Sequence, residues 1–97
     1  MPDRMGCAEI SFSGHAIRRI FERGLEMDGV LQVVASGEVL ARYPEDQPYP
    51  SALLLGYVCD KAVHVVVARE PESGQCFVVT AYYPDPERWS EDFRTRR

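Results

Sequence analysis

Hydrophobic positions recur at helical spacing in the first third of the chain. Ser13 is a favourable N-cap residue, and the amphipathic run after it extends to Arg23 and stops at Gly24. The apolar residues on one side of this run are Ala16, Ile17, Ile20 and Phe21. The pattern therefore predicts a first helix that packs on the core through this stripe, with its polar residues on the opposite side.

A second helix is predicted directly afterwards. Asp28 is its expected N-cap, the helix runs to Ser36, and Gly37 ends it. Its apolar residues cover more than half of its circumference, which is typical of a helix that is largely surrounded by protein. We therefore expect the second helix to be the more deeply buried of the two.

From Gly37 onward the pattern is typical of strands, because Val, Leu, Phe and Tyr dominate. The predicted strands are Glu38–Tyr43, Ala52–Val58, Ala62–Arg69 and Cys76–Tyr83. The proline-rich segment Pro44–Pro50 indicates a loop, whereas Asp60-Lys61 and Pro71–Gly74 are expected hairpin turns. Two helices followed by such a run predict an α+β fold, in which the helices pack on a mainly antiparallel sheet of about four strands.

The C-terminal region has a helix-start signal of its own. Asp85 and Pro86 form an N-cap and first-turn pair, and Trp89 and Phe93 stand four residues apart. We therefore expect a short final helix that buries Trp89. Residues 1–97 are interpreted as a single domain with its core at about 10–93, and both ends, including Arg94–Arg97, are expected to be mobile.

Composition and charge limit the classes of protein that the chain can represent. The apolar fraction is 45%, the charged fraction is 27% and the formal net charge is −4, which argues against a protein that coats nucleic acid through general positive charge. No apolar run is long enough to span a membrane, and the N-terminus does not resemble a secretion signal. The three cysteines, Cys7, Cys59 and Cys76, are far apart. We therefore expect free cysteines, no zinc site and a cytoplasmic protein.

Two segments carry a family resemblance. The segment from His15 to Gly24 (HAIRRIFERG) resembles the "HAxxRxxxRG" motif that opens the bacterial family called domain of unknown function 4258. The segment from Val79 to Trp89 (VTAYYPDPERW) resembles the closing "vTvYxPDpexW" motif of that family. Between these motifs, residues 37–39 and 63–67 also fit in order and spacing. The resemblance covers nearly the whole chain from Phe12 to Trp89.

The resemblance implies a RelE-type or barnase-like fold, with helices packed on an antiparallel sheet. Several families of that group are mRNA endonucleases, some of them ribosome-dependent, and some members of this family are encoded beside a small antitoxin-like protein. RNA or the ribosome and an antitoxin protein are therefore the implied partners. One departure weakens the ribosome-binding version, because this chain has a pI near 5.1 whereas RelE-type toxins tend to be basic.

The first helix offers the residues that RNA cleavage would require. His15 lies in the first turn, where unpaired backbone N–H groups favour a phosphate, and it is the candidate general base or acid. Arg19 lies one turn further along the same face as a candidate phosphate contact within the catalytic site. Arg18 and Arg23 are further candidate phosphate-binding residues. The alternative interpretation is that all four side chains are only the solvated face of an amphipathic helix.

Three residues of the predicted strands complete the candidate site. His64 lies in a strongly apolar strand, as a catalytic residue or as a histidine of the core. Tyr82 is a candidate for base stacking or phosphate contact, or an ordinary strand aromatic, and Thr80 lies on the same face of its strand. If residues 69 and 75 flank the turn, His64 pairs with Thr80, whereas flanking by 70 and 75 turns His64 to the other face.

The sequence supports two functions from different classes. The first is a metal-independent, toxin-type endoribonuclease with His15, Arg19, His64 and Tyr82 in its catalytic site and no cofactor. The second is a non-catalytic interaction module, whose first-helix face or basic tail binds a protein or a nucleic acid. No metal site is expected, because two histidines without clustered acidic residues supply too few ligands.

Overall fold

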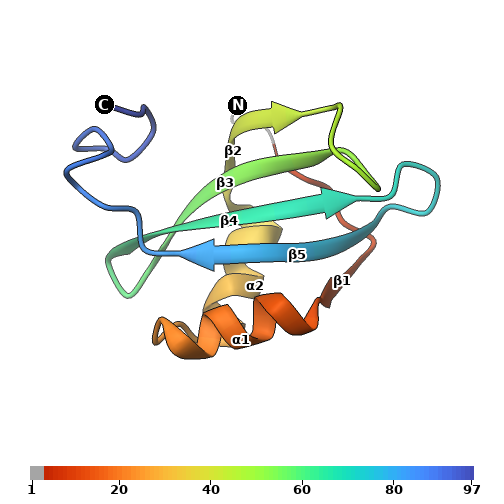
Figure 1. Ribbon diagram of the computed structural model, residues 1–97, viewed down its shortest axis with the longest axis horizontal. Helices are drawn as coiled ribbons and strands as arrows, with labels where there is room; N and C mark the ends of the chain where they lie inside the picture. Colours follow the sequence, from red (N-terminus) through yellow and green to blue (C-terminus); the bar gives the residue numbers. More distant parts are fainter. Residues whose placement is uncertain (1–3) are drawn as a thin grey trace.

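The structure is a computed structural model that describes residues 4–97, and it consists of a five-stranded sheet with two helices on one face (Figure 1). Its elements are β1 (Glu9–Phe12), α1 (Gly14–Glu22), α2 (Met27–Ser36), β2 (Glu38–Tyr43), β3 (Ser51–Val58), β4 (Lys61–Arg69) and β5 (Gln75–Tyr82). The strand order is β1-β5-β4-β3-β2, and the pairs from β2 to β5 are antiparallel. The predicted α+β arrangement, with two helices packed on a mainly antiparallel sheet, is confirmed.

The predicted number of strands is wrong by one. The additional strand, β1, precedes the first helix and pairs with β5 in parallel, from Glu9 opposite Gln75 to Phe12 opposite Val78. Its four residues are too few for a clear alternation of apolar and polar positions, and its partner is distant in sequence. β1 can therefore be recognised only from the three-dimensional structure, through its pairing with β5.

The two helices bury their apolar residues in one core with the strands. The Ser13 hydroxyl accepts a hydrogen bond of 3.0 Å from the Ala16 N–H, which confirms Ser13 as the N-cap of α1. α2 begins one residue before Asp28, with Glu26 at the N-cap position. The core residues include Ala16, Ile20, Val30, Val33, Val34, Leu54, Val63, Val65, Val67 and Val78. A Cβ at Gly56 of β3 would lie 2.7 Å from Val33 Cγ2, so the glycine permits the close approach of α2.

The predicted core stripe of α1 is only half correct. Ala16 and Ile20 are buried, but Ile17 is 47% exposed and Phe21 is 85% exposed. The reason is that α1 packs along β5 at the edge of the layer, whereas α2 covers β3 and β4. Only a narrow strip of α1 therefore contacts the core.

The predicted C-terminal helix does not form. The Asp85 carbonyl accepts the Arg88 and Trp89 N–H groups, which makes a single turn. Side chain–backbone hydrogen bonds then compete with the helix, because Asp92 accepts the Arg94 N–H at 3.1 Å. The chain turns back through Phe93, whose φ is 60°, and Trp89 pairs with Arg96 in an isolated β-bridge. Trp89 is nevertheless buried, as expected.

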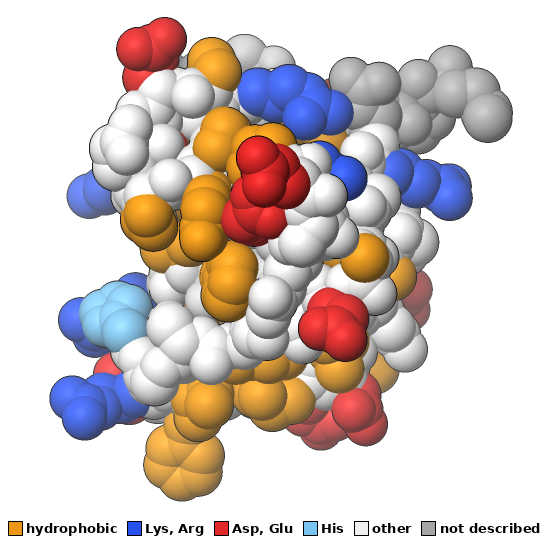
Figure 2. Space-filling model, turned by 90° about the vertical axis from the view of Figure 1, so that its right-hand side faces the viewer, with side chains coloured by type: hydrophobic (Ala, Val, Ile, Leu, Met, Phe, Trp, Pro, Cys, Tyr) orange, Lys and Arg blue, Asp and Glu red, His pale blue; other side chains and the backbone are white. Residues whose placement is uncertain are grey.

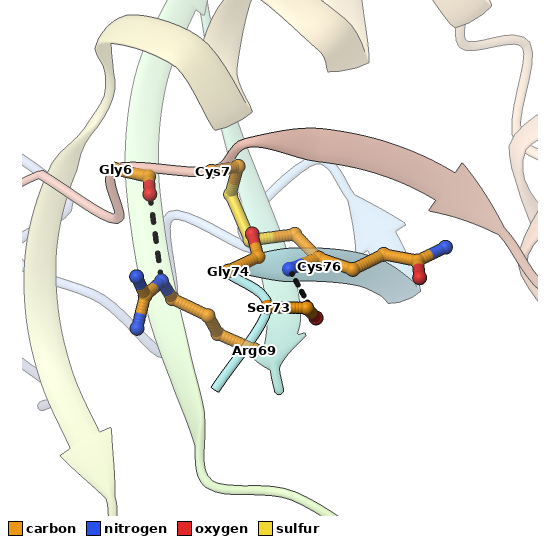
Figure 3. The surroundings of a disulfide bond; sticks show 7 residues. Gly6, Cys7, Arg69, Ser73, Gly74 and Cys76 are labelled. Carbon is orange, nitrogen blue, oxygen red and sulfur yellow. Dashed lines mark hydrogen bonds between the residues drawn. A yellow bond between two sulfur atoms is a disulfide. The ribbon is translucent and has the colours of Figure 1, made fainter. Parts of the chain in front are cut away.

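The prediction of free cysteines is wrong for two of them, because Cys7 and Cys76 form a disulfide (Figure 3). The bond joins the residue two positions before β1 to the second residue of β5. Their wide separation of 69 residues hid the pairing, since the parallel pairing of β1 with β5 was not apparent. Cys59 is free and exposed in the β3–β4 turn. The disulfide removes the argument for a reducing compartment that rested on free cysteines.

Both ends of the chain were expected to be mobile. The expected mobile N-terminus comprises the residues before about 10. Residues 1–3 lie outside the described residues, whereas Met5 is buried in the core and Cys7 is bonded to Cys76. Arg94 at the other end contacts Glu38 of β2 at 2.9 Å.

Within residues 4–97, neither helix has the length and apolar character that crossing a membrane would require.

Candidate functional site

Two candidate residues of α1 and the candidate residue at its C-cap, Arg23, lie along one flank of the helix. His15, Arg19 and Arg23 are spaced by four residues, so they follow one another on the same side, and all three are exposed. We call this line of side chains the basic flank. Arg18 is also exposed, but it follows a different line on the helix. The amphipathic sequence produces this arrangement because burial of Ala16 and Ile20 fixes the rotation of α1 about its axis.

Arg23 connects the basic flank to the sheet. Its Nη1 donates hydrogen bonds to Thr80 Oγ1 at 3.2 Å and to the Ala81 carbonyl at 2.8 Å. β1 pairs with β5 only as far as Val78, so α1 rather than a strand lies beside the rest of β5 (Figure 1). Two of the predicted phosphate-binding residues, Arg23 and Thr80, are thus in direct contact.

A β-bulge decides which strand residues share a face. Arg69 pairs with Cys76 at the turn, which by itself would turn His64 away from Tyr82. The register then shifts between Val66 and Val67, so that His64 lies opposite Tyr82. His64, Thr80 and Tyr82 are therefore on the same face of the sheet, the face opposite α2.

His64 is fully buried beneath the C-terminal segment. Its Nε2 lies 2.9 Å from the Phe93 carbonyl and its Nδ1 lies 3.3 Å from the Tyr82 hydroxyl. A carbonyl only accepts, so Nε2 carries the proton, and the Tyr82 hydroxyl donates to Nδ1. The Trp89 ring packs edge-on against the imidazole, with centroids 4.4 Å apart. In this arrangement, His64 holds the C-terminal segment on the sheet.

Burial lowers the pKa of His64, and the hydrogen bond to Phe93 opposes this effect. The unfolded chain therefore binds a proton below pH 6.5 more readily than the folded protein does. We expect the free energy of unfolding to be at its full value above pH 6.5 and to fall as the pH decreases below it. Urea unfolding from pH 8 to pH 5, followed by Trp89 fluorescence, measures this loss.

Two variants isolate the contribution of His64. His64→Gln should lose less stability than the wild type between pH 7 and pH 5, whereas His15→Gln, at the exposed histidine, should lose as much as the wild type. Equal losses in the wild type and His64→Gln would show that another group is responsible.

Tyr82 has neighbours in the structure that the sequence analysis did not predict. Burial raises the pKa of Tyr82 most and Tyr43 raises it further, whereas the positive charges of Arg96 and Arg23 lower it. Tyr43 and Arg96 were not predicted as site residues. The positive charges of the C-terminal tail could be seen in the sequence, but the position of Arg96 beside Tyr82 depends on the turn at Phe93 that folds the tail back onto the sheet.

The chemistry available at this surface is that of binding anions and aromatic rings. Arg19 Nη1 lies 3.4 Å from the Glu22 carboxylate, and both side chains are about half exposed. An exposed pair of this kind contributes little to stability, so Arg19 is available to another anion. Among residues 4–97, no group of three or more His, Cys, Asp or Glu side chains is arranged to hold a metal ion.

Comparison with known proteins places the chain in a family. No curated protein and no solved structure matches it. A family model matches residues 12–83, from the end of β1 to the residue after β5, and so includes both α1 and the strand that carries Thr80 and Tyr82. The match covers well over half of the chain, and the protein therefore belongs to the family described as Domain of unknown function (DUF4258).

Proposed function

We propose that this protein is a toxin-type endoribonuclease that binds single-stranded RNA along the basic flank and cleaves it without a metal ion. The observation that supports the proposal most is the contact of Arg23 with Thr80 and Ala81. This contact makes the flank continuous with the strand that carries Tyr82. A polynucleotide backbone follows such a line of cations and polar groups, despite the net charge of −4.

The reaction is attack of a ribose 2′-hydroxyl on the adjacent phosphorus. His15 takes the hydroxyl proton as the O2′–P bond forms, and the P–O5′ bond breaks. The departing 5′ oxygen takes a proton from water, and a 2′,3′-cyclic phosphate remains. Arg19 stabilises the additional negative charge on the phosphate oxygens in the transition state.

The strand residues have supporting roles in this proposal. His64 is buried and both of its ring nitrogens have partners, so it does not exchange protons with RNA. It positions Tyr82 instead, through the hydrogen bond to the phenol. Arg23 and Thr80 hold a phosphate beside Tyr82, and Arg18 contacts the RNA further out on α1. RNA, free or on the ribosome, is the substrate class, and an antitoxin protein is the regulatory partner.

Salt dependence and one substitution test the binding step. Neutralising two or three phosphates of a single strand predicts that the logarithm of the association constant falls with the logarithm of the salt concentration with a slope of about −1.5 to −2. Arg19→Ala should weaken binding, and the slope should become shallower by about 0.7, because one phosphate contact is lost. Fluorescence anisotropy with a labelled oligoribonucleotide measures both quantities.

Arg4→Ala is the matched control, because Arg4 is exposed but lies before β1 and outside the basic flank. It should leave both affinity and slope at their wild-type values. Equal effects of Arg4→Ala and Arg19→Ala would mean that RNA responds to general charge and not to the flank.

A second function is favoured by a different observation. Phe21 is 85% exposed, and Ile17 and Met27 are 47% and 37% exposed, so α1 and the start of α2 present apolar side chains to solvent. Figure 2 shows apolar side chains at the lower part of the view, beside basic side chains and a histidine. Exposed apolar residues of this kind are typical of surfaces that bind proteins. If the wild type cleaves neither long RNA nor RNA on translating ribosomes, a non-catalytic interaction module becomes the better interpretation.

A further inference from the structure

A groove lies on the sheet face opposite α2, between the strands and the C-terminal segment. Its volume is about 420 Å³, and it is lined by residues of all four antiparallel strands as well as by the C-terminal turn. The lining residues that matter here are Tyr43, Leu53, Val66, Tyr82, Trp89 and Arg96. The volume lies in the range of small-molecule sites, which are commonly about 300–1,000 Å³.

The lining combines flat rings and aliphatic side chains with a few polar groups. Leu53 is buried and Val66 is half-buried, so the floor of the groove is aliphatic. The sides of the groove include Tyr43, which is 41% exposed, and Tyr82, which is half-buried. Aromatic and aliphatic walls with sparse polar groups suit a planar heterocycle, which stacks on the rings and hydrogen-bonds at its edges.

Positive charge lies at the rim of the groove. Arg94 already pairs with Glu38 and Asp92. Arg96 instead lies over the Trp89 ring, 5.9 Å from its centroid, and no carboxylate of residues 4–97 forms an ion pair with it. The Arg96 guanidinium is therefore available to an anion, which makes the groove complementary to a planar ring that carries a phosphate.

We infer that this groove binds one unstacked base of a single-stranded RNA, with the adjacent phosphate on Arg96. The inference rests on the proposed function and specifies a base subsite for it. Tyr82 lines the groove, and Arg23 contacts Thr80, which lies on the same face of β5 as Tyr82. The RNA strand therefore continues from the groove past Tyr82 to the basic flank. The base is held by stacking and shape, and the phosphates are held by Arg96, Arg23 and Arg19.

A titration with nucleotides tests the subsite without requiring cleavage. Adenosine and cytidine 5′-monophosphates should change the fluorescence of Trp89, the only tryptophan of the chain, whereas ribose 5-phosphate at the same concentration should not. Tyr43→Leu should weaken nucleotide binding by about 5-fold to 100-fold through lost stacking. Arg96→Gln should weaken binding of the nucleotide but not of the corresponding nucleoside.

Matched controls exist for both substitutions. Tyr57 is a 57% exposed tyrosine of β3 that does not line the groove, and Arg4 is an exposed arginine outside it. Tyr57→Leu and Arg4→Gln should bind nucleotides as the wild type does. Circular dichroism and the unfolding midpoint of each variant show whether a loss of binding reflects a loss of folding.

The outcomes separate the subsite from the proposed function. If RNA is cleaved normally by Tyr43→Leu and Arg96→Gln, and nucleotides leave Trp89 unchanged, the base subsite is overturned while the endoribonuclease stands. If nucleotides bind with the expected variant pattern but RNA is not cleaved, the subsite stands and the proposed activity fails. If ribose 5-phosphate binds as well as the nucleotides do, the groove is a phosphate site and the base inference is overturned.

Discussion

Loss of the Cys7–Cys76 disulfide should lower the free energy of unfolding by about 2–4 kcal/mol. The bond joins residues that are 69 positions apart in the sequence, and it restricts the unfolded chain more strongly than a bond between near neighbours would. It also holds the start of β1 next to β5, where the Ala8 N–H donates to the Gly74 carbonyl at 2.9 Å. Urea unfolding of the oxidised wild type, the reduced wild type and Cys7→Ala/Cys76→Ala measures the effect.

The free thiol supplies the control for this experiment. Cys59 is exposed in the β3–β4 turn, so Cys59→Ala should keep the wild-type stability and its response to reductant. The double variant should show no response to reductant. If the oxidised and reduced wild type unfold at the same urea concentration, the bond does not contribute to stability, or it does not form in solution.

The disulfide also bears on the candidate site. β1 leads through Ser13 directly into α1, so the bond helps to fix where the basic flank begins. Ser13 adds a contact of its own, because its hydroxyl donates to the Val78 carbonyl at 3.4 Å. Reduction should therefore affect binding at the basic flank more than binding at the groove, because Cys76 lies near the start of β5 whereas Tyr82, which lines the groove, lies at its other end.

The elements that the sequence predicted correctly are those with strong local signals. Ser13 and Gly37 mark helix ends through capping, and the β-rich runs after Gly37 mark strands. β1 was not predicted because it pairs in parallel with a strand that is distant in sequence, and such a pairing has no connecting turn that could be recognised locally. The prediction of a C-terminal helix was wrong because the Asp92 carboxylate accepts the Arg94 N–H and the chain turns back at Phe93, and a helix-start signal at Asp85 does not reveal how far a helix can continue.

The candidate site was predictable where it depends on one helix and unpredictable where it depends on pairing. The spacing of His15, Arg19 and Arg23 is enough to place them on one flank. The common face of His64 and Tyr82 depends on a bulge between Val66 and Val67, and a bulge leaves no periodic signal.

The exposure of Phe21 likewise depends on tertiary structure. It results from the position of α1 at the layer edge, which the helical pattern cannot specify. The same limit applies to Arg96, whose place beside Tyr82 requires the C-terminal segment to fold back on the sheet.

His15→Ala should lower the rate of RNA cleavage by about 10²-fold to 10⁴-fold, the usual contribution of a general base. Binding should change little, because His15 removes a proton in the transition state and Arg19 holds the phosphate in both states. The stability should also remain close to that of the wild type, since His15 is exposed and outside the core. Single-turnover cleavage of a long single-stranded RNA, with binding measured in parallel, separates the rate from the affinity.

His64→Gln is the informative comparison, because it removes the other histidine of the chain. It should lower the stability and loosen the C-terminal segment, but near neutral pH and under folding conditions it should retain far more activity than His15→Ala does. If His64→Gln lost more activity than His15→Ala, the catalytic base would be His64 of β4 and not His15 of α1. The C-terminal segment over His64 would then have to open before RNA could react. Equal cleavage by His15→Ala and the wild type would remove the catalytic assignment altogether and leave the basic flank as a binding surface.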